Sequence, residues 1–141
     1  TNLQAALGVA QLERLDEFVA RKRHMGALYT ELLAGLGGVQ FPLARTDAAD
    51  NVYWVYGLVA DERHGDAASI MRRLAERGIG CRPFFCPLHQ QPVLRQRGWY
   101  ENQQYPVAER LYRQGFYIPS GLGLSVPQIH EVANAVRAVL R

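Results

Sequence analysis

The protein is a chain of 141 residues, of which 48% are hydrophobic and 21% charged, and its formal net charge is +3. A chain this apolar and this weakly charged can bury a core, which excludes intrinsic disorder. No apolar run approaches the roughly 20 residues that span a bilayer, and no secretory signal opens the chain, so neither a membrane helix nor secretion is predicted.

The basic residues and the cysteines indicate which partners and which cellular compartment to expect. The basic residues are fifteen arginines and a single lysine, Lys22, and they are scattered among glutamates. This pattern favours solvated helix faces over a nucleic-acid-binding stripe. Cys81 and Cys86 are too few for a disulfide framework, so we expect free thiols and a cytoplasmic protein.

The first predicted element is a long amphipathic helix. Apolar residues recur mostly at steps of three, four or seven from Leu3 to Leu36. Such a helix would be about 50 Å long, which is more than a compact domain of this size needs. We therefore expect residues 1–36 to link two bodies or to pack along a partner.

The remaining elements predict a small α/β unit over residues 51–141, with one sheet and helices packed on it. Together with the first helix it forms a single domain, residues 1–141. The expected elements are a strand at Asn51–Ala60, a helix capped by Asp66, a short strand at Cys81–Phe85, an irregular proline-rich stretch at Arg82–Val93, a helix that begins at Pro106 and is ended by Gly115, a strand at Phe116–Pro119, and a last helix behind the capping box of Ser125 and Gln128.

Polar and aromatic groups concentrate in two loops, residues 82–92 and 118–123. In the first loop, Arg82 is followed by Phe84, Phe85 and His89, a set that suits an anionic ligand with a ring to stack. The alternative is an ordinary loop with Phe84 in the core. The second loop offers the hydroxyl of Ser120 and the main-chain N–H groups of a turn.

Signs of catalysis within the chain are weak. His24, His64 and His130 have the pattern of surface residues. His89 has no evident serine, cysteine or carboxylate partner, although a pair with Cys86 stays open. The spacing of the cysteines and histidines does not predict a zinc site.

Two further features fall short of a cofactor site. Gly121 and Gly123 give only half of a phosphate-binding glycine motif. Lys22 stands in a run of three basic residues, which predicts a solvated face and not a desolvated Schiff-base lysine.

Four ordered motifs carry a resemblance that spans nearly the whole chain. They are Thr1-Asn2-Leu3-Gln4-Ala5-Ala6-Leu7-Gly8 with Gln11-Leu12 and Arg21-Lys22-Arg23, then Gly78-Ile79-Gly80-Cys81-Arg82-Pro83-Phe84-Phe85-Cys86-Pro87-Leu88-His89, then Tyr105-Pro106-Val107-Ala108-Glu109-Arg110, and finally Phe116-Tyr117-Ile118-Pro119-Ser120-Gly121-Leu122. The chain resembles the sugar-nucleotide aminotransferases of the DegT/DnrJ/StrS type.

The resemblance implies the small C-terminal domain of the aspartate-aminotransferase fold and an enzyme that uses pyridoxal 5'-phosphate. Such enzymes move an amino group, usually from glutamate, to a keto-sugar carried on a nucleotide, and they act as homodimers. The Arg82 and Ser120 motifs look most like those of perosamine synthases, which aminate a 4-keto-6-deoxy hexose on GDP. The resemblance implies substrate contacts for Arg82, Phe85, His89 and Ser120.

The resemblance also implies that the cofactor-binding residues lie in a large domain upstream of Thr1, which this sequence does not contain. No residue here matches a catalytic or cofactor-binding position. Two hypotheses follow: the chain is part of an aminotransferase, or it is a stand-alone, non-catalytic module that binds a nucleotide sugar or assembles with a partner. The first predicts that part of the apolar stripe between Leu3 and Leu36 is exposed.

Overall fold

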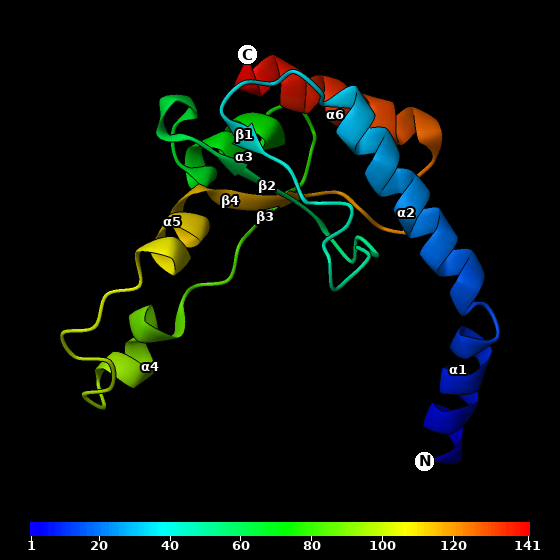
Figure 1. Ribbon diagram of the computed structural model, residues 1–141, viewed down its shortest axis with the longest axis horizontal. Helices are drawn as coiled ribbons and strands as arrows, with labels where there is room; N and C mark the ends of the chain where they lie inside the picture. Colours follow the sequence, from blue (N-terminus) through cyan, green and yellow to red (C-terminus); the bar gives the residue numbers. More distant parts are fainter.

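A four-stranded antiparallel sheet organises the body of the protein in the computed structural model, which describes residues 1–141 (Figure 1). The strands lie in the order β1 (Val39–Gln40), β2 (Tyr56–Ala60), β4 (Gly115–Ile118) and β3 (Arg82–Pro83). The helices are α1 (Asn2–Leu12), α2 (Leu15–Leu32), α3 (Ala67–Ala75), α4 (Pro92–Arg95), α5 (Pro106–Gln114) and α6 (Val126–Leu140), with short 3-10 turns η1 (Glu62–His64) and η2 (Leu88–Gln90). The architecture is the mixed α/β unit that the sequence predicts.

The core lies between one face of the sheet and the helices α2, α3 and α6. Alternate strand residues face it because side chains along a strand point to opposite faces. Leu58 of β2 and Phe116 of β4 are fully buried there, beside Tyr29 of α2 and Ile70 of α3. The core therefore joins segments from both halves of the chain into one body.

The other face of the sheet is shaped by two glycines and a phenylalanine. A Cβ on Gly115 would stand 2.4 Å from the Phe84 ring, and one on Gly57 would stand 3.0 Å from it. The Phe84 ring thus occupies the space that the missing side chains leave, and it stacks on Tyr117 at 4.7 Å between centroids. Phe84 is thus a packing residue, but it packs on the face of the sheet opposite the core and not in the core, where the alternative interpretation of its loop placed it.

The predicted continuous helix from Leu3 to Leu36 is instead two helices. Arg14 leaves the helical conformation with φ −114° and ψ 11°, and its N–H bonds to the carbonyl of Gln11, as in a 3-10 turn. Its side chain folds onto the next turn, where it pairs with Glu17 at 3.0 Å and lies over the Phe18 ring. The first helix thus ends at Leu12, and α2 carries the chain into the core.

Strand β2 is half as long as the stretch Asn51–Ala60 that was expected. The length of a strand is limited by its partners, and β4 pairs with it only from Tyr56 to Val59. Before that point Tyr53 has φ 51°, and its ring lies against Gly26 of α2. Strand β3 is likewise shorter than Cys81–Phe85. By contrast, α5 begins at Pro106 and α6 behind the Ser125–Gln128 capping box, as predicted.

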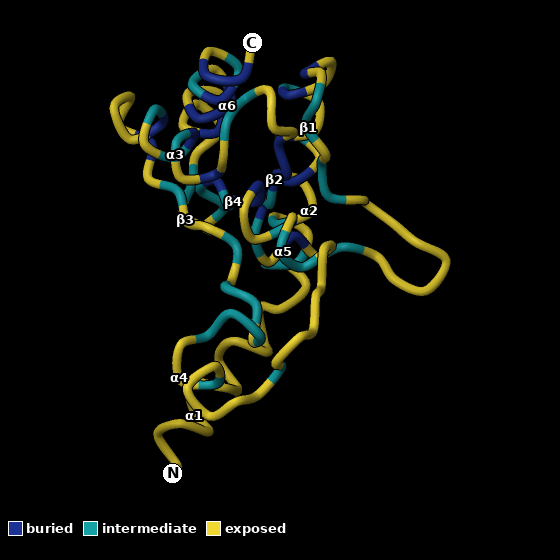
Figure 2. Tube along the Cα trace, turned by 90° about the vertical axis from the view of Figure 1, so that its left-hand side faces the viewer, coloured by how far each residue is buried: buried dark blue, intermediate teal, exposed yellow.

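Two segments extend from this body. One is α1, which contains no buried residue, and the other is the segment 86–105, which carries η2 and α4 and which we call the arm. Figure 2 shows α1 as exposed along its length. No helix combines the length and the apolar character that crossing a membrane requires.

Candidate functional site

Arg82 and Ser120, two of the predicted substrate-binding residues, line the same pocket. Arg82 belongs to β3 and pairs in register with Tyr117 of β4, while Ser120 follows β4 by two residues. The pocket holds about 220 Å³ and is lined by Val55, Gly80, Arg82, Tyr117, Ile118, Pro119 and Ser120. We call it the Arg82–Ser120 pocket. Antiparallel pairing of β3 and β4 thus joins two loops that the sequence separates by 38 positions.

The guanidinium of Arg82 is available for a ligand. No ion pair and no side-chain hydrogen bond of the structure engages it, and the residue is exposed. A free guanidinium offers a planar fork of donors that matches a carboxylate or a phosphate. The pocket can therefore hold an anionic group at its Arg82 end.

The turn that carries Ser120 is held by α2 and β2. The Tyr29 hydroxyl donates to the carbonyl of Pro119 at 2.8 Å, and the main-chain N–H of Tyr56 donates to Ser120 Oγ at 3.3 Å. The Ser120 hydroxyl keeps its own hydrogen for a further acceptor. Burial raises the pKa of Tyr29, so this phenol stays a donor throughout the physiological range.

Phe85 stands beside this pocket and faces solvent. Its side chain is 75% exposed, and its ring centroid lies 6.3 Å from that of Tyr117, which itself lines the pocket. An exposed aromatic ring beside a residue that lines the pocket gives an apolar face for a ring-shaped ligand. Phe84 and Phe85, adjacent in sequence, thus divide into one packing residue and one surface residue.

His89 lies in a different pocket. This second pocket, of about 310 Å³, is formed within the arm by His89, Arg95, Trp99, Tyr100, Glu101, Asn102 and Gln103. It shares no lining residue with the Arg82–Ser120 pocket. The structure thus brings Arg82 and Ser120 into one pocket, leaves Phe85 outside its wall beside Tyr117, and sets His89 apart.

The carboxylate partner of His89, which the sequence did not reveal, is Glu109 of α5. His89 Nε2 lies 2.9 Å from Glu109 Oε1, and the same oxygen accepts the main-chain N–H of Tyr105 at 3.1 Å. These contacts lower the pKa of Glu109, the Tyr105 N–H first and the His89 bond second. The imidazole is 9% exposed and lies against the Tyr105 ring, so the contact closes the base of the arm.

Lys22 is not the solvated residue that its basic neighbours suggested. Its ammonium group donates to the main-chain carbonyls of Trp54, at 3.0 Å, and of Ser120. Burial lowers its pKa, but two carbonyls hold the group. The only lysine of the chain is thus engaged in positioning the Ser120 turn, and its ammonium group does not fit the part of a Schiff-base lysine.

The other histidines and the two cysteines line neither of these two pockets. Cys86 belongs to the same loop as Phe85 and His89. His24 and His130 are exposed, as expected, whereas the side chain of His64 is only 10% exposed and contacts the carbonyl of Gly37. Cys81 and Cys86 are free thiols, and burial raises the pKa of Cys81 to about 11. A thiol with so high a pKa is protonated and unreactive at neutral pH.

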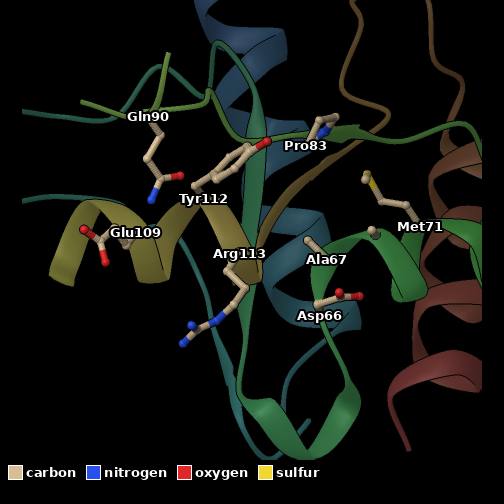
Figure 3. A pocket seen from close by; sticks show the side chains of 9 residues that line it. Asp66, Ala67, Met71, Pro83, Gln90, Glu109, Tyr112 and Arg113 are labelled. Atoms are coloured by element: carbon tan, nitrogen blue, oxygen red, sulfur yellow. The ribbon is translucent and has the colours of Figure 1, made fainter. Parts of the chain in front are cut away.

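A larger pocket of about 370 Å³ opens between the start of α3 and α5 (Figure 3). Its charged groups already have partners inside the protein. Asp66 accepts the N–H of Ser69 and caps α3, Arg113 pairs with Glu62, and Glu109 holds His89. Because these groups are satisfied, this pocket offers a ligand less than the smaller Arg82–Ser120 pocket does.

Comparison with known proteins identifies relatives of the whole chain. The profile of the DegT/DnrJ/EryC1/StrS aminotransferase family matches residues 1–137. The GDP-perosamine synthase of Vibrio cholerae is 32% identical over 143 residues, which cover 97% of this chain and 36% of that protein. EpsN of Bacillus subtilis, a putative pyridoxal phosphate-dependent aminotransferase, is 34% identical over 89% of this chain and 32% of its own length.

Solved structures agree with the fold. The crystal structure of S. venezuelae DesV superimposes with a TM-score of 0.85 at 29% identity, over 98% of this chain and 36% of that one. The chain thus spans about a third of the length of the relatives that it matches. With a family profile that covers almost every residue, the protein belongs to the DegT/DnrJ/EryC1/StrS aminotransferase family.

Proposed function

We propose that the chain supplies the part that contacts the sugar nucleotide in an aminotransferase that uses pyridoxal 5'-phosphate. The enzyme transfers an amino group from glutamate to a GDP-linked 4-keto-6-deoxy sugar. The observation that carries the proposal is the Arg82–Ser120 pocket, which joins an unpaired guanidinium, a serine hydroxyl and aromatic rings. The similarity to the V. cholerae GDP-perosamine synthase supports the choice of substrate.

Each predicted substrate-binding residue has a distinct task in this proposal. The Arg82 fork binds a phosphate oxygen pair of the nucleotide, and the faces of Phe85 and Tyr117 pack against a ring. The Ser120 hydroxyl donates to an oxygen of the ligand. His89, held by Glu109, meets a more distant part of the extended substrate at the base of the arm. Together they orient the keto carbon, and orientation alone supplies a large share of a rate enhancement.

The cofactor belongs to residues outside this chain. Pyridoxal phosphate, when bound to the enzyme, carries the amino group between donor and acceptor. Lys22 is clamped by two carbonyls and has no role in that step. In this proposal residues 1–141 are the small C-terminal domain of a cytoplasmic homodimeric enzyme, and a large domain holds the cofactor.

The exposed surface of α1 supports a larger assembly. Leu3, Leu7 and Leu12 are exposed to 80%, 68% and 67%, and residues of this type seldom gather on a free surface. A stand-alone module that binds a nucleotide sugar is the second candidate. It is favoured by the twenty-residue core, which residues 25–140 complete by themselves.

The mass of the native polypeptide decides between the two candidates. The polypeptide would be captured from the source cells with an antibody against this segment, and its intact mass would be measured. We expect a species far heavier than 15.9 kDa. A species at 15.9 kDa would overturn the aminotransferase proposal in favour of the module.

A further inference from the structure

A cavity of about 230 Å³ lies between α2, the turn after β4 and the start of α6. We call it the α2–α6 cavity. It is lined by Arg21, Lys22, His24, Met25, Gly121, Leu122, Leu124, Ser125, Val126 and Ile129. It is distinct from the Arg82–Ser120 pocket, with which it shares no lining residue, and the turn 119–121 separates the two.

The charged and titratable residues that line this cavity are all basic. Arg21, Lys22 and His24 take part in none of the ion pairs of the structure. Arg21 donates only to the carbonyl of Leu124, at 3.4 Å, and Lys22 only to carbonyls. Glu17, one turn before Arg21, pairs with Arg14 instead. Arg21 and Lys22 therefore carry charge at this cavity without an ion pair, although Glu17 lies near enough to Arg21 for the two charges to interact.

Main-chain donors without a partner lie at the same place. No hydrogen bond of the structure uses the N–H of Gly121, Leu122 or Val126, although all three residues line the cavity. Val126 is also the first residue of α6, a helix of 15 residues, and the start of a helix carries a partial positive charge. N–H groups without a partner inside the protein and basic side chains without an ion pair both favour the same kind of ligand, an oxyanion.

We propose that the α2–α6 cavity binds a phosphate group. A tetrahedral oxyanion there would pair with the cations and accept from the free N–H groups, as phosphates do at helix starts elsewhere. Apolar side chains make up half of the wall, namely Met25, Leu122, Leu124, Val126 and Ile129. The phosphate can therefore come free from solution or as the ester of an apolar body.

The test is a titration of the full chain with inorganic phosphate and, in a second arm, with phenyl phosphate. Amide NMR resonances of Gly121, Leu122 and Val126 would be followed in a phosphate-free buffer, against chloride at matched ionic strength. We expect saturable shifts at these amides with phosphate and none with chloride. Tighter binding of phenyl phosphate identifies an ester as the ligand, and equal or weaker binding identifies free phosphate.

Two variants separate a site from diffuse charge. Arg21→Gln removes a cation that lines the cavity, whereas Arg23→Gln removes one that is exposed on the same helix and lies outside it. Arg21→Gln is expected to weaken phosphate binding about fivefold or more, as the loss of a charge-assisted contact does. Arg23→Gln should leave it unchanged. Equal weakening by both variants, or shifts that chloride reproduces, would overturn the proposal.

Discussion

Arg82 is the residue on which substrate binding depends most in this account. Its guanidinium is free, whereas most other arginines near the sheet and core are engaged, such as Arg113 with Glu62 and Arg137 with the carbonyl of Leu32. Because no partner inside the protein orders this side chain, its guanidinium can form charge-assisted hydrogen bonds only with a ligand or with water. That is the behaviour expected of a binding residue.

In the full aminotransferase, Arg82→Ala should raise the KM for the sugar nucleotide by about tenfold or more, since a hydrogen bond to a charged group contributes roughly 1.5–3 kcal/mol. The half-reaction with glutamate should change little, because the proposed function assigns Arg82 to the nucleotide and not to the donor. Steady-state kinetics with each substrate varied in turn checks this. Arg77→Ala, at an exposed arginine outside every pocket described above, is the matched control. An unchanged KM for the sugar nucleotide would contradict the assignment.

Glu109 contacts two residues of the arm, His89 and Tyr105, through a single carboxylate oxygen. Its folded-state pKa is lowered, so its bonds to Tyr105 and His89 are strongest above the usual glutamate pKa near 4.5 and are lost as the pH falls through the lowered value. We therefore expect the NMR signals of the His89 and Tyr105 rings to shift together with that titration.

Glu109→Gln removes the charge from this contact and should increase hydrogen exchange within the arm while the core stays protected. Hydrogen exchange read by mass spectrometry over residues 86–104 provides the measurement. Glu131→Gln, at an exposed position of α6 without an ion pair, controls for the loss of charge. Equal protection of the arm in both variants would show that the His89–Glu109 contact does not hold it.

At the scale of elements, two helical glycines provide a matched pair. A Cβ on Gly26 of α2 would stand 2.4 Å from the Tyr53 ring, whereas one on Gly8 of α1 meets nothing within 4 Å. Gly26→Ala should therefore destabilise the fold by about 1–3 kcal/mol through overpacking. Gly8→Ala should raise the helicity of α1, because alanine favours a helix by roughly 1 kcal/mol over glycine.

Urea denaturation gives the free energy of unfolding for both glycine variants, and far-UV circular dichroism gives helicity. If Gly26→Ala were as stable as the wild type, Tyr53 would not be seated against α2 as described. The contact matters because Tyr53 sits at the point where the loop after β1 joins β2, opposite the Ser120 turn.

The helices whose starts the sequence predicted correctly are marked by residues within their own first turn. Pro106 at the first turn of α5 and the Ser125–Gln128 capping box both act within four residues. The interruption of the first helix at Arg14 and the shortening of β2 have other causes, because a 3-10 turn and the length of a partner strand decide them. A sequence pattern predicts structure that neighbouring residues stabilise. The length of β2 depends instead on its pairing with β4, which lies some sixty positions away.

The candidate site divides in the same way. Arg82 and Ser120 could be selected from their residue types and loops, and their meeting follows from the pairing of β3 with β4. The partner of His89 stayed hidden because Glu109 is twenty positions away, and only the return of the chain at the base of the arm brings it close. The prediction of a solvated Lys22 is wrong because its ammonium group donates to main-chain carbonyls, and a sequence does not reveal such partners.

At the scale of the whole molecule, α1 lies apart from the core as an apolar helix that contacts little of the body (Figures 1 and 2). A surface of this kind is energetically favourable only when another surface covers it. Leu7→Ser should therefore leave the free energy of unfolding within about 0.5 kcal/mol of the wild type, since Leu7 makes no core contact.

The same Leu7→Ser substitution should reduce self-association of the chain, measured by sedimentation velocity over a range of concentrations. Val107→Ser changes an apolar residue of equal exposure, 68%, on α5 and serves as the control. Association that Val107→Ser reduces and Leu7→Ser does not would place the contact on the α5 side of the molecule instead of on α1.

The central claim is that this chain works within a sugar-nucleotide aminotransferase, and transfer of label tests it most directly. The native polypeptide would be supplied with pyridoxal phosphate, ¹⁵N-glutamate and a GDP-linked 4-keto-6-deoxy hexose, and the products would be resolved by mass spectrometry. The account predicts a GDP-linked amino sugar that carries ¹⁵N, formed more slowly at low sugar concentration by the Arg82→Ala variant. Binding of the sugar nucleotide without any transfer of ¹⁵N would contradict it.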